Sequence, residues 1–145
     1  MQNITNIRII PSNDTIKKIV QMVDSYNLPH TDFDAHPHCT IIYSRDVIDA
    51  KKIKLPKIKL PIMVTNAKLK MFDTPDDGNV LVIEFDCDEA KQCFDYMKRE
   101  YNIITKYNEY KPHITLQKNI TTQYTSLPKI TFDLCFDKLW VTNCD

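Results

Sequence analysis

The chain has 145 residues, of which 43% are hydrophobic and 26% charged, values that are ordinary for one folded domain spanning residues 1–145. Nineteen basic residues balance nineteen acidic ones, so no overall field attracts the chain to a long nucleic acid, and a small phosphorylated ligand fits better. The apolar runs are too short to span a bilayer and the first residues lack the features of a secretory signal, so we expect a cytoplasmic protein without membrane contact.

The first part of the chain predicts a strand, a helix and a second strand. Residues 4–10 favour a strand, and the polar residues at 12–14 can cap a helix in which Ile16, Ile19, Val20 and Val23 follow helical spacing. We expect this helix to end near residues 28–29. After a polar loop, residues 38–44 are rich in β-branched and aromatic side chains and predict a strand.

The second part predicts mainly strands around one further helix. Residues 48–61 alternate lysines with Ile and Leu and contain two prolines, which favours an extended edge segment. Residues 62–72 and 80–87 predict two strands, and the turn residues at 74–79 predict that they form a hairpin. A helix after Asp88, a strand at 113–118 and a final strand region at 130–142 complete the chain.

This order of elements predicts an α+β fold of two lobes. Each lobe would be a β-α-β unit, the two would be related by pseudo-symmetry, and their antiparallel sheets would surround a central groove. The predicted symmetry rests on a partial repeat: residues 26–40 moved by 75 positions bring Pro37-His38 and Thr40 onto Pro112-His113 and Thr115.

The repeated segment is a Pro-His-x-Thr motif at the start of an apolar strand. Residues at i and i+2 of a strand share a face, so His38 with Thr40, and His113 with Thr115, each present an imidazole and a hydroxyl to one side. Two imidazoles facing one groove can supply a general base and a general acid near neutral pH. The sequence leaves open which histidine takes which role, because coupled imidazoles titrate as a pair.

The segments His38-Cys39-Thr40-Ile41 and His113-Ile114-Thr115-Leu116 resemble the paired motifs of the two-histidine (2H) phosphoesterase superfamily. Within it, residues 38–45, 69–72, 79–82 and 110–116 resemble the bacteriophage anti-CBASS nucleases. This resemblance implies an enzyme that destroys the cyclic di- and trinucleotides with which bacteria signal infection.

The resemblance implies a specific reaction at the four motif residues. One histidine would take a proton from a ribose 2′-hydroxyl or water, the other would protonate the leaving 5′-oxygen, and the threonines would bind the phosphate oxygens. No metal or other cofactor is required. Two alternatives stay open: an enzyme acting on 2′,3′-cyclic or 2′–5′ linkages of RNA, and a non-catalytic sponge that only sequesters nucleotide.

Several other side chains have a functional and an ordinary interpretation. Phe72, Tyr110 and Trp140 are candidates for stacking on the bases, although each is also a plausible core residue. His36 and His38 with Asp34 resemble a metal cluster, but Pro37 restricts how the two histidines converge, so we expect no metal site. If the strand is regular, Tyr43 and Arg45 point away from the groove.

Three residue types exclude or limit other functions. Gly78 is the one glycine, which excludes the glycine-rich loops of NTPases and nicotinamide enzymes. The five cysteines are odd in number and form no Cys-x-x-Cys pair, so we expect reduced thiols. The lysines between positions 51 and 59 predict a solvated edge face, with attraction of a polyanion as the alternative, an effect that would tune ligand capture rather than chemistry. The oligomeric state cannot be inferred from the sequence.

Overall fold

The computed structural model describes residues 4–106 and 109–144. Its described strands form one antiparallel sheet in the order β3-β7-β1-β2-β6-β5-β4. The strands are β1 (Thr5–Pro11), β2 (Cys39–Ser44), β3 (Ile62–Val64), β4 (Lys68–Thr74), β5 (Gly78–Glu84), β6 (His113–Gln117) and β7 (Leu134–Thr142). The helices are α1 (Asn13–Ser25), α2 (Thr31–Ala35) and α3 (Asp88–Tyr101), with a short 3-10 helix, η1 (Ala50–Lys52).

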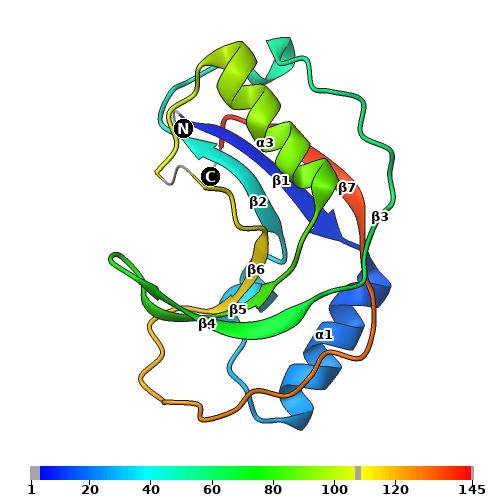
Figure 1. Ribbon diagram of the computed structural model, residues 1–145, viewed down its shortest axis with the longest axis vertical. Coiled ribbons are helices and arrows are strands. Elements are labelled where there is room, and N and C mark those ends of the chain that lie inside the picture. Colours follow the sequence, from blue (N-terminus) through cyan, green and yellow to red (C-terminus); the bar gives the residue numbers. More distant parts are fainter. Residues whose placement is uncertain (1–3, 107–108, 145) are drawn as a thin grey trace.

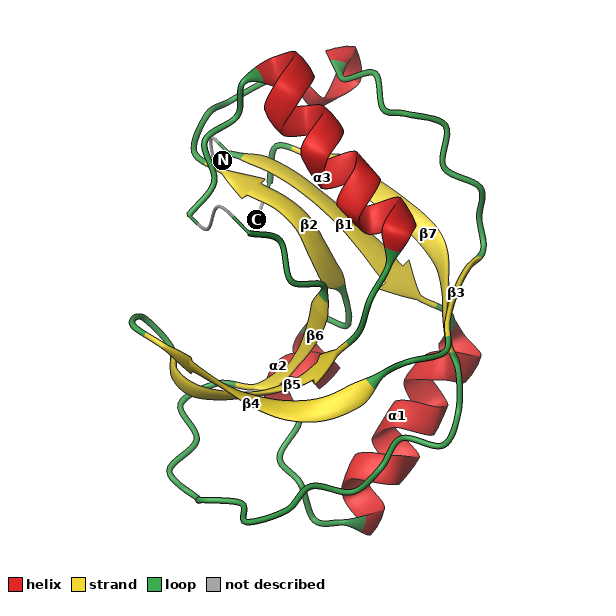
Figure 2. Cartoon of the chain, in the orientation of Figure 1, coloured by secondary structure: helices red, strands yellow, loops and turns green. Residues whose placement is uncertain are grey.

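The sheet is strongly curled, so that the half containing β2 and the half containing the β4–β5 hairpin bend toward each other (Figure 1). Figure 2 shows the helices distributed around this single curved sheet rather than alternating with its strands. Helix α1 packs near β7, α2 packs against β6, and α3 packs against β2. The two strands with the histidine motifs therefore lie in the middle of the sheet, each supported by a helix.

The predicted two-lobe fold is wrong. Instead of two β-α-β units with separate sheets around a groove, the structure has one continuous antiparallel sheet, because β2 pairs directly with β6 through Cys39 and Ile114. The first and last parts of the chain are also intermixed, since β1 lies between β2 and β7. The repeat of the motif therefore describes two neighbouring strands and not two lobes.

Helix α1 begins where the sequence predicts it. The Ser12 hydroxyl accepts a hydrogen bond of 3.2 Å from the backbone N–H of Thr15, and the apolar face buries Ile19 and Val23. The helix ends at Ser25, earlier than the predicted position, because Asn27 adopts a left-handed φ of 53°.

The predicted strand at 62–72 is two strands at opposite edges of the sheet. Residues 62–64 pair with β7, whereas residues 68–74 pair with β5. The predicted hairpin is confirmed for the second part, where Gly78 has a φ of 66° at the end of the turn. The segment predicted as an extended edge at 48–61 forms no strand, because it contains η1 and residues 53–61 have no regular secondary structure.

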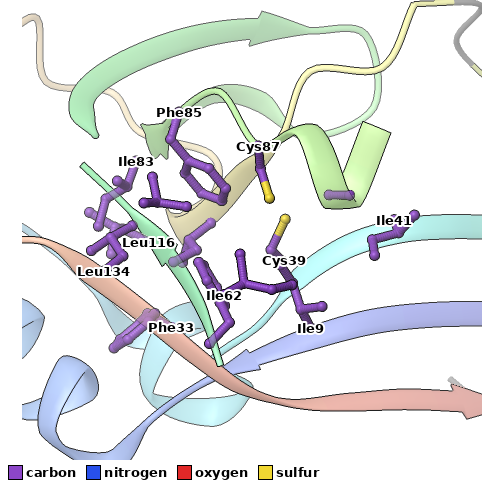
Figure 3. Packing of buried hydrophobic residues seen from close by; sticks show 14 of the residues in the cluster. Ile9, Phe33, Cys39, Ile41, Ile62, Ile83, Phe85, Cys87, Leu116 and Leu134 are labelled. Carbon is purple, nitrogen blue, oxygen red and sulfur yellow. The ribbon is translucent and has the colours of Figure 1, made fainter. Parts of the chain in front are cut away.

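The hydrophobic core is shared by the sheet and the helices. Figure 3 shows side chains from distant segments meeting there, among them Ile9, Phe33, Cys39, Phe85 and Leu116. All five cysteines are free thiols, and burial raises the pKa of the Cys39 thiol to about 12. This core fixes one face of β2 and β6, which leaves the alternate residues of these strands for the opposite face.

Candidate active site

The register of β2 and β6 brings the two motifs together. Cys39 lies opposite Ile114, so Thr40 lies opposite His113, and continuing the register by one residue places His38 opposite Thr115. The four side chains form a square in which the histidines occupy one diagonal and the threonines the other. Diagonal neighbours on a sheet are about 7–8 Å apart. We call these four residues the motif square.

The motif square lies in a row of residues that crosses most of the sheet on one face. Arg8 of β1 pairs with Thr40 of β2 on one side and with Trp140 of β7 on the other. On the other side, His113 pairs with Glu84 of β5, and Glu84 pairs with Lys68 of β4. This row, which we call the site row, is Trp140, Arg8, Thr40, His113, Glu84 and Lys68.

The two motif histidines are held in the same tautomer. The Nδ1–H of His38 donates to the backbone carbonyl of His36 at 2.6 Å, and the Nδ1–H of His113 donates to the carbonyl of Lys111 at 2.8 Å. Because a carbonyl only accepts, the proton of each neutral ring is on Nδ1 and Nε2 keeps its lone pair. Each ring thus offers Nε2 to accept or, when protonated, to donate a proton.

Burial favours the neutral form of both histidines. It lowers the pKa of His38 to about 4, aided by the positive charge of Arg8 and the neighbouring His36 and His113, although the bond to the His36 carbonyl opposes the shift. Burial also lowers the pKa of His113, against the opposing effects of the Lys111 carbonyl and the Glu84 carboxylate. The two rings therefore have different charged neighbours.

The two threonines of the motif square lie on the same face of the sheet as the two histidines. Thr40 and Thr115 are both half-buried on the sheet face that carries the site row, which we call the site face. Neither hydroxyl has a hydrogen-bond partner among the residues that the structure describes. Hydroxyls at such positions can donate to a phosphate oxygen that lies between the two histidines.

Arg8 and His36 extend the site beyond the predicted residues. Arg8 is only 4% exposed, and its Nη1 donates to Nε2 of His36 at 2.5 Å. The ring centroids of His36 and His38 are 5.0 Å apart. From the sequence, His36 was considered only as part of a possible metal cluster, and Arg8 was not predicted to be a site residue. The available signal was a lone arginine within the apolar run of β1.

The three predicted aromatic residues have different surroundings. The Phe72 ring lies edge-on to the ring of His113, with centroids 5.1 Å apart. Trp140 is 48% exposed and lines a pocket of about 440 Å³ together with Arg8 and His36. Tyr110 stacks on Phe94 at 4.9 Å, and its hydroxyl donates to the Thr40 carbonyl at 2.9 Å. Phe72 therefore borders the motif square, Trp140 lies one strand beyond it next to Arg8, and Tyr110 supports β2.

Tyr43 lies on the site face, contrary to the parity argument from the sequence. The pairing of β1 with β2 changes register between Ile7 and Arg8, so that Tyr43 lies opposite Asn6. Asn6 and Arg8 are two residues apart and share a face, which places Tyr43 on the face of Thr40. A regular strand would have turned it away.

The suspected metal cluster is not assembled in this fold. Asp34 Oδ1 accepts a hydrogen bond of 2.9 Å from Nδ1 of His30, while His36 is engaged by Arg8. No group of three or more His, Cys, Asp or Glu side chains is placed to hold a metal ion within residues 4–106 and 109–144. Over the same residues, no helix is both long and apolar enough to cross a membrane.

Fold and site together define a curled antiparallel sheet protein with a paired imidazole–hydroxyl centre in its middle. The model of the family described as anti-CBASS protein Acb1 matches residues 5–141, and the chain belongs to this family. The match includes every residue of the motif square and the site row. Family membership supports an anti-CBASS role.

Proposed function

We propose that this protein is a phosphodiesterase that hydrolyses the 3′–5′ bonds of cyclic di- or trinucleotide second messengers, so that a phage evades CBASS immunity of its host. The observation that carries the proposal is the motif square, with two Nε2 atoms and two hydroxyls on one sheet face. The resemblance of the motifs to the 2H phosphoesterases and the family match support it.

The chemistry follows from the two imidazoles. Nε2 of one neutral ring takes the proton of a ribose 2′-hydroxyl or of water, whose oxygen attacks the phosphorus. Nε2–H of the other ring protonates the 5′-oxygen as its bond to phosphorus breaks. Paired general acid and base groups contribute typically 10²–10⁴-fold each to rate. In this proposal the protein needs no metal ion or other cofactor.

Thr40 and Thr115 stabilise the charge that develops on the phosphate. Their hydroxyls donate to the non-bridging oxygens, whose negative charge is greatest in the transition state. Phe72 beside His113 and Trp140 beside Arg8 offer ring faces and edges against which the bases of the ligand stack. The site thus contacts both the reacting phosphate and the adjoining nucleosides.

The proposal is tested by incubating the purified chain, in EDTA, with cyclic di- and trinucleotides, linear 2′–5′ oligonucleotides and RNA with 2′,3′-cyclic ends. We expect ring opening of the cyclic compounds, detected by chromatography. His38→Ala and His113→Ala should each reduce kcat at least about 100-fold, and Thr40→Ala or Thr115→Ala about 10–100-fold. Thr121→Ala, in an exposed loop, is the matched control.

Each other result would overturn the proposal in a distinct way. Cleavage confined to linear or terminal-cyclic RNA would identify an RNA-end enzyme. Tight binding with intact ligand recovered after denaturation would identify a sponge. Cleavage that persists in both histidine variants would remove the motif square from the chemistry.

A further inference from the structure

The charges on the two sides of the motif square have opposite signs. Arg8, on β1, lies beside Thr40, and its Nη1 contacts His36. The ring of His36 is next to the ring of His38, and the His36 carbonyl accepts the Nδ1–H of His38. Since an arginine does not lose its proton in proteins, His36 Nε2 must accept this bond, and His36 is neutral. A permanent positive charge is therefore built into the side of the square that holds His38.

A negative charge lies on the other side. Glu84 is the direct cross-strand partner of His113, and directly opposed side chains have Cβ atoms about 4.5–5.5 Å apart. Glu84 and Arg8 are separated by three strand spacings, or about 14 Å, so each acts mainly on its own neighbour. The Glu84 side chain is mostly buried, with 18% exposed.

From this arrangement we infer that Arg8 and Glu84 divide the acid–base roles, with His38 as the general base and His113 as the general acid. The inference rests on the proposed function. Arg8 disfavours a second positive charge at His38, which keeps that ring neutral. Glu84 favours the positive charge at His113. Neither contacts the reacting atoms in this scheme, so both are positioning residues.

The reaction step is then fully assigned. His38 Nε2 receives the proton of the nucleophilic hydroxyl or water as the new phosphorus–oxygen bond forms. The phosphorus–O5′ bond breaks, its electron pair leaves with O5′, and this oxygen receives the proton from His113 Nε2. After the step His38 is charged and His113 neutral, and exchange with solvent restores the starting forms.

Other charged groups near the rings modify this balance without reversing it. Lys68 and Lys70 of β4 lie 3.8 and 3.6 Å from the Glu84 carboxylate and offset part of its charge. On α2, which packs against β6, Asp34 is engaged by His30, and Asp32 accepts from the Lys118 backbone N–H at 2.7 Å. Lys111 lies two positions before His113 on the same segment, and its backbone carbonyl accepts the Nδ1–H of His113.

The pH dependence of kcat/KM tests whether each charge acts on its neighbouring histidine. In Glu84→Gln, the basic limb of the bell should move down by about one pH unit while the acidic limb stays, because only the acid loses its stabilising charge. In Arg8→Gln, the acidic limb should move up by a similar amount. Glu84→Asp and Arg8→Lys should restore the limbs, and the exposed Glu100→Gln should change neither.

The maximum of the pH profile tests which histidine is the base and which is the acid, independently of the pH at which the maximum falls. With His38 as base and His113 as acid, both substitutions reduce the population of the reactive protonation state and lower the maximum rate. If the roles were reversed, the wild-type charges would oppose the reactive state, and Glu84→Gln and Arg8→Gln would both increase the rate. An increase in both would overturn the inference.

A cyclic dinucleotide with sulfur in place of the bridging 5′-oxygen gives a second test. Because a thiolate leaves without protonation, His113→Ala should regain most activity on this substrate, whereas His38→Ala should not. Recovery by His38→Ala instead would reverse the assignment.

Titration of the histidine ring protons by NMR distinguishes failure of this inference from failure of the proposed function. We expect His113 to hold its proton to higher pH than His38, and Glu84→Gln to lower the His113 midpoint selectively. The reverse order would refute the charge arrangement whether or not any nucleotide is cleaved. The expected order without cleavage would refute only the function.

Discussion

At the scale of single residues, Tyr110 connects the aromatic core to the candidate site. Its ring stacks on Phe94 and its hydroxyl donates to the Thr40 carbonyl, so it holds β2 where Thr40 enters the motif square. We expect Tyr110→Phe to destabilise the fold by about 1 kcal/mol, measured by urea denaturation, through loss of this hydrogen bond. Tyr110→Ala, which also removes the stacking, should cost about 3–5 kcal/mol.

The same variants separate a structural role from a base-binding role. If Tyr110 only supports β2, Tyr110→Phe should bind cyclic nucleotide with nearly unchanged affinity. Unchanged stability combined with weakened binding would contradict the structural role and return Tyr110 to the predicted base contacts.

The residues recognisable from sequence were those whose chemistry is visible within one segment. His38 and His113 could be found because each motif carries its histidine and threonine two positions apart in the same strand. Arg8 and Glu84 could not, since their importance depends on which strand lies beside which. Likewise, the register change that brings Tyr43 onto the site face leaves no mark in the alternation of residues 39–44.

At the scale of elements, local patterns predicted most helices and strands but did not predict which strands pair with each other. Residues 62–72 read as one strand because both halves are apolar and extended. The break occurs at 65–67, where Asn66 accepts from the Asp86 backbone N–H at 2.7 Å and redirects the chain. A sequence pattern gives the face of a strand, but pairing with β7 or with β5 is decided by long-range packing.

His30 joins helices α1 and α2 by two bonds. Nε2 lies 2.6 Å from Asp24 Oδ1 and Nδ1 lies 2.9 Å from Asp34 Oδ1. Burial lowers the pKa of His30, but the two carboxylates outweigh it, so the pKa is raised above 6.5. The stabilisation is therefore fully present below about pH 6.5 and is lost as pH rises through the folded-state pKa.

We expect His30→Gln to reduce the free energy of unfolding by about 0.5–1 kcal/mol at pH 6 and by less at pH 9, because only the charged ring makes both bonds to carboxylates. Urea denaturation at the two pH values measures the difference. An equal loss at both would mean that the link between the helices does not depend on the charge of His30.

At the scale of the whole molecule, the continuity of the sheet explains why the two-lobe prediction failed. The equal spacing of two motifs suggested two equivalent folding units, yet antiparallel pairing of β2 with β6 creates the same local symmetry within one sheet. Two neighbouring antiparallel strands are related by a local two-fold axis, which is enough to place each histidine opposite the other motif's threonine. The site therefore has the predicted pairing although the fold around it differs.

This sheet face also gives the molecule a characteristic dependence of stability on pH. Burial lowers the pKa of His36, His38 and His113, with that of His38 at about 4. Below about pH 6.5 the unfolded chain binds protons that these folded rings resist. Their contribution to stability is thus complete above that pH and decreases as pH falls toward 4.

We expect His38→Gln to weaken this dependence. Between pH 7.5 and pH 5 the variant should lose about 1–2 kcal/mol less unfolding free energy than the wild type, as measured by urea denaturation. His30→Gln is the internal control. Because the pKa of His30 is raised in the folded protein, this variant should lose more unfolding free energy than the wild type over the same pH range. Carboxylates that titrate in the same range affect all three proteins alike, so the comparison isolates the histidines. Equal slopes for the wild type and His38→Gln would contradict a neutral, desolvated ring at the centre of the sheet, and with it the base role inferred for His38.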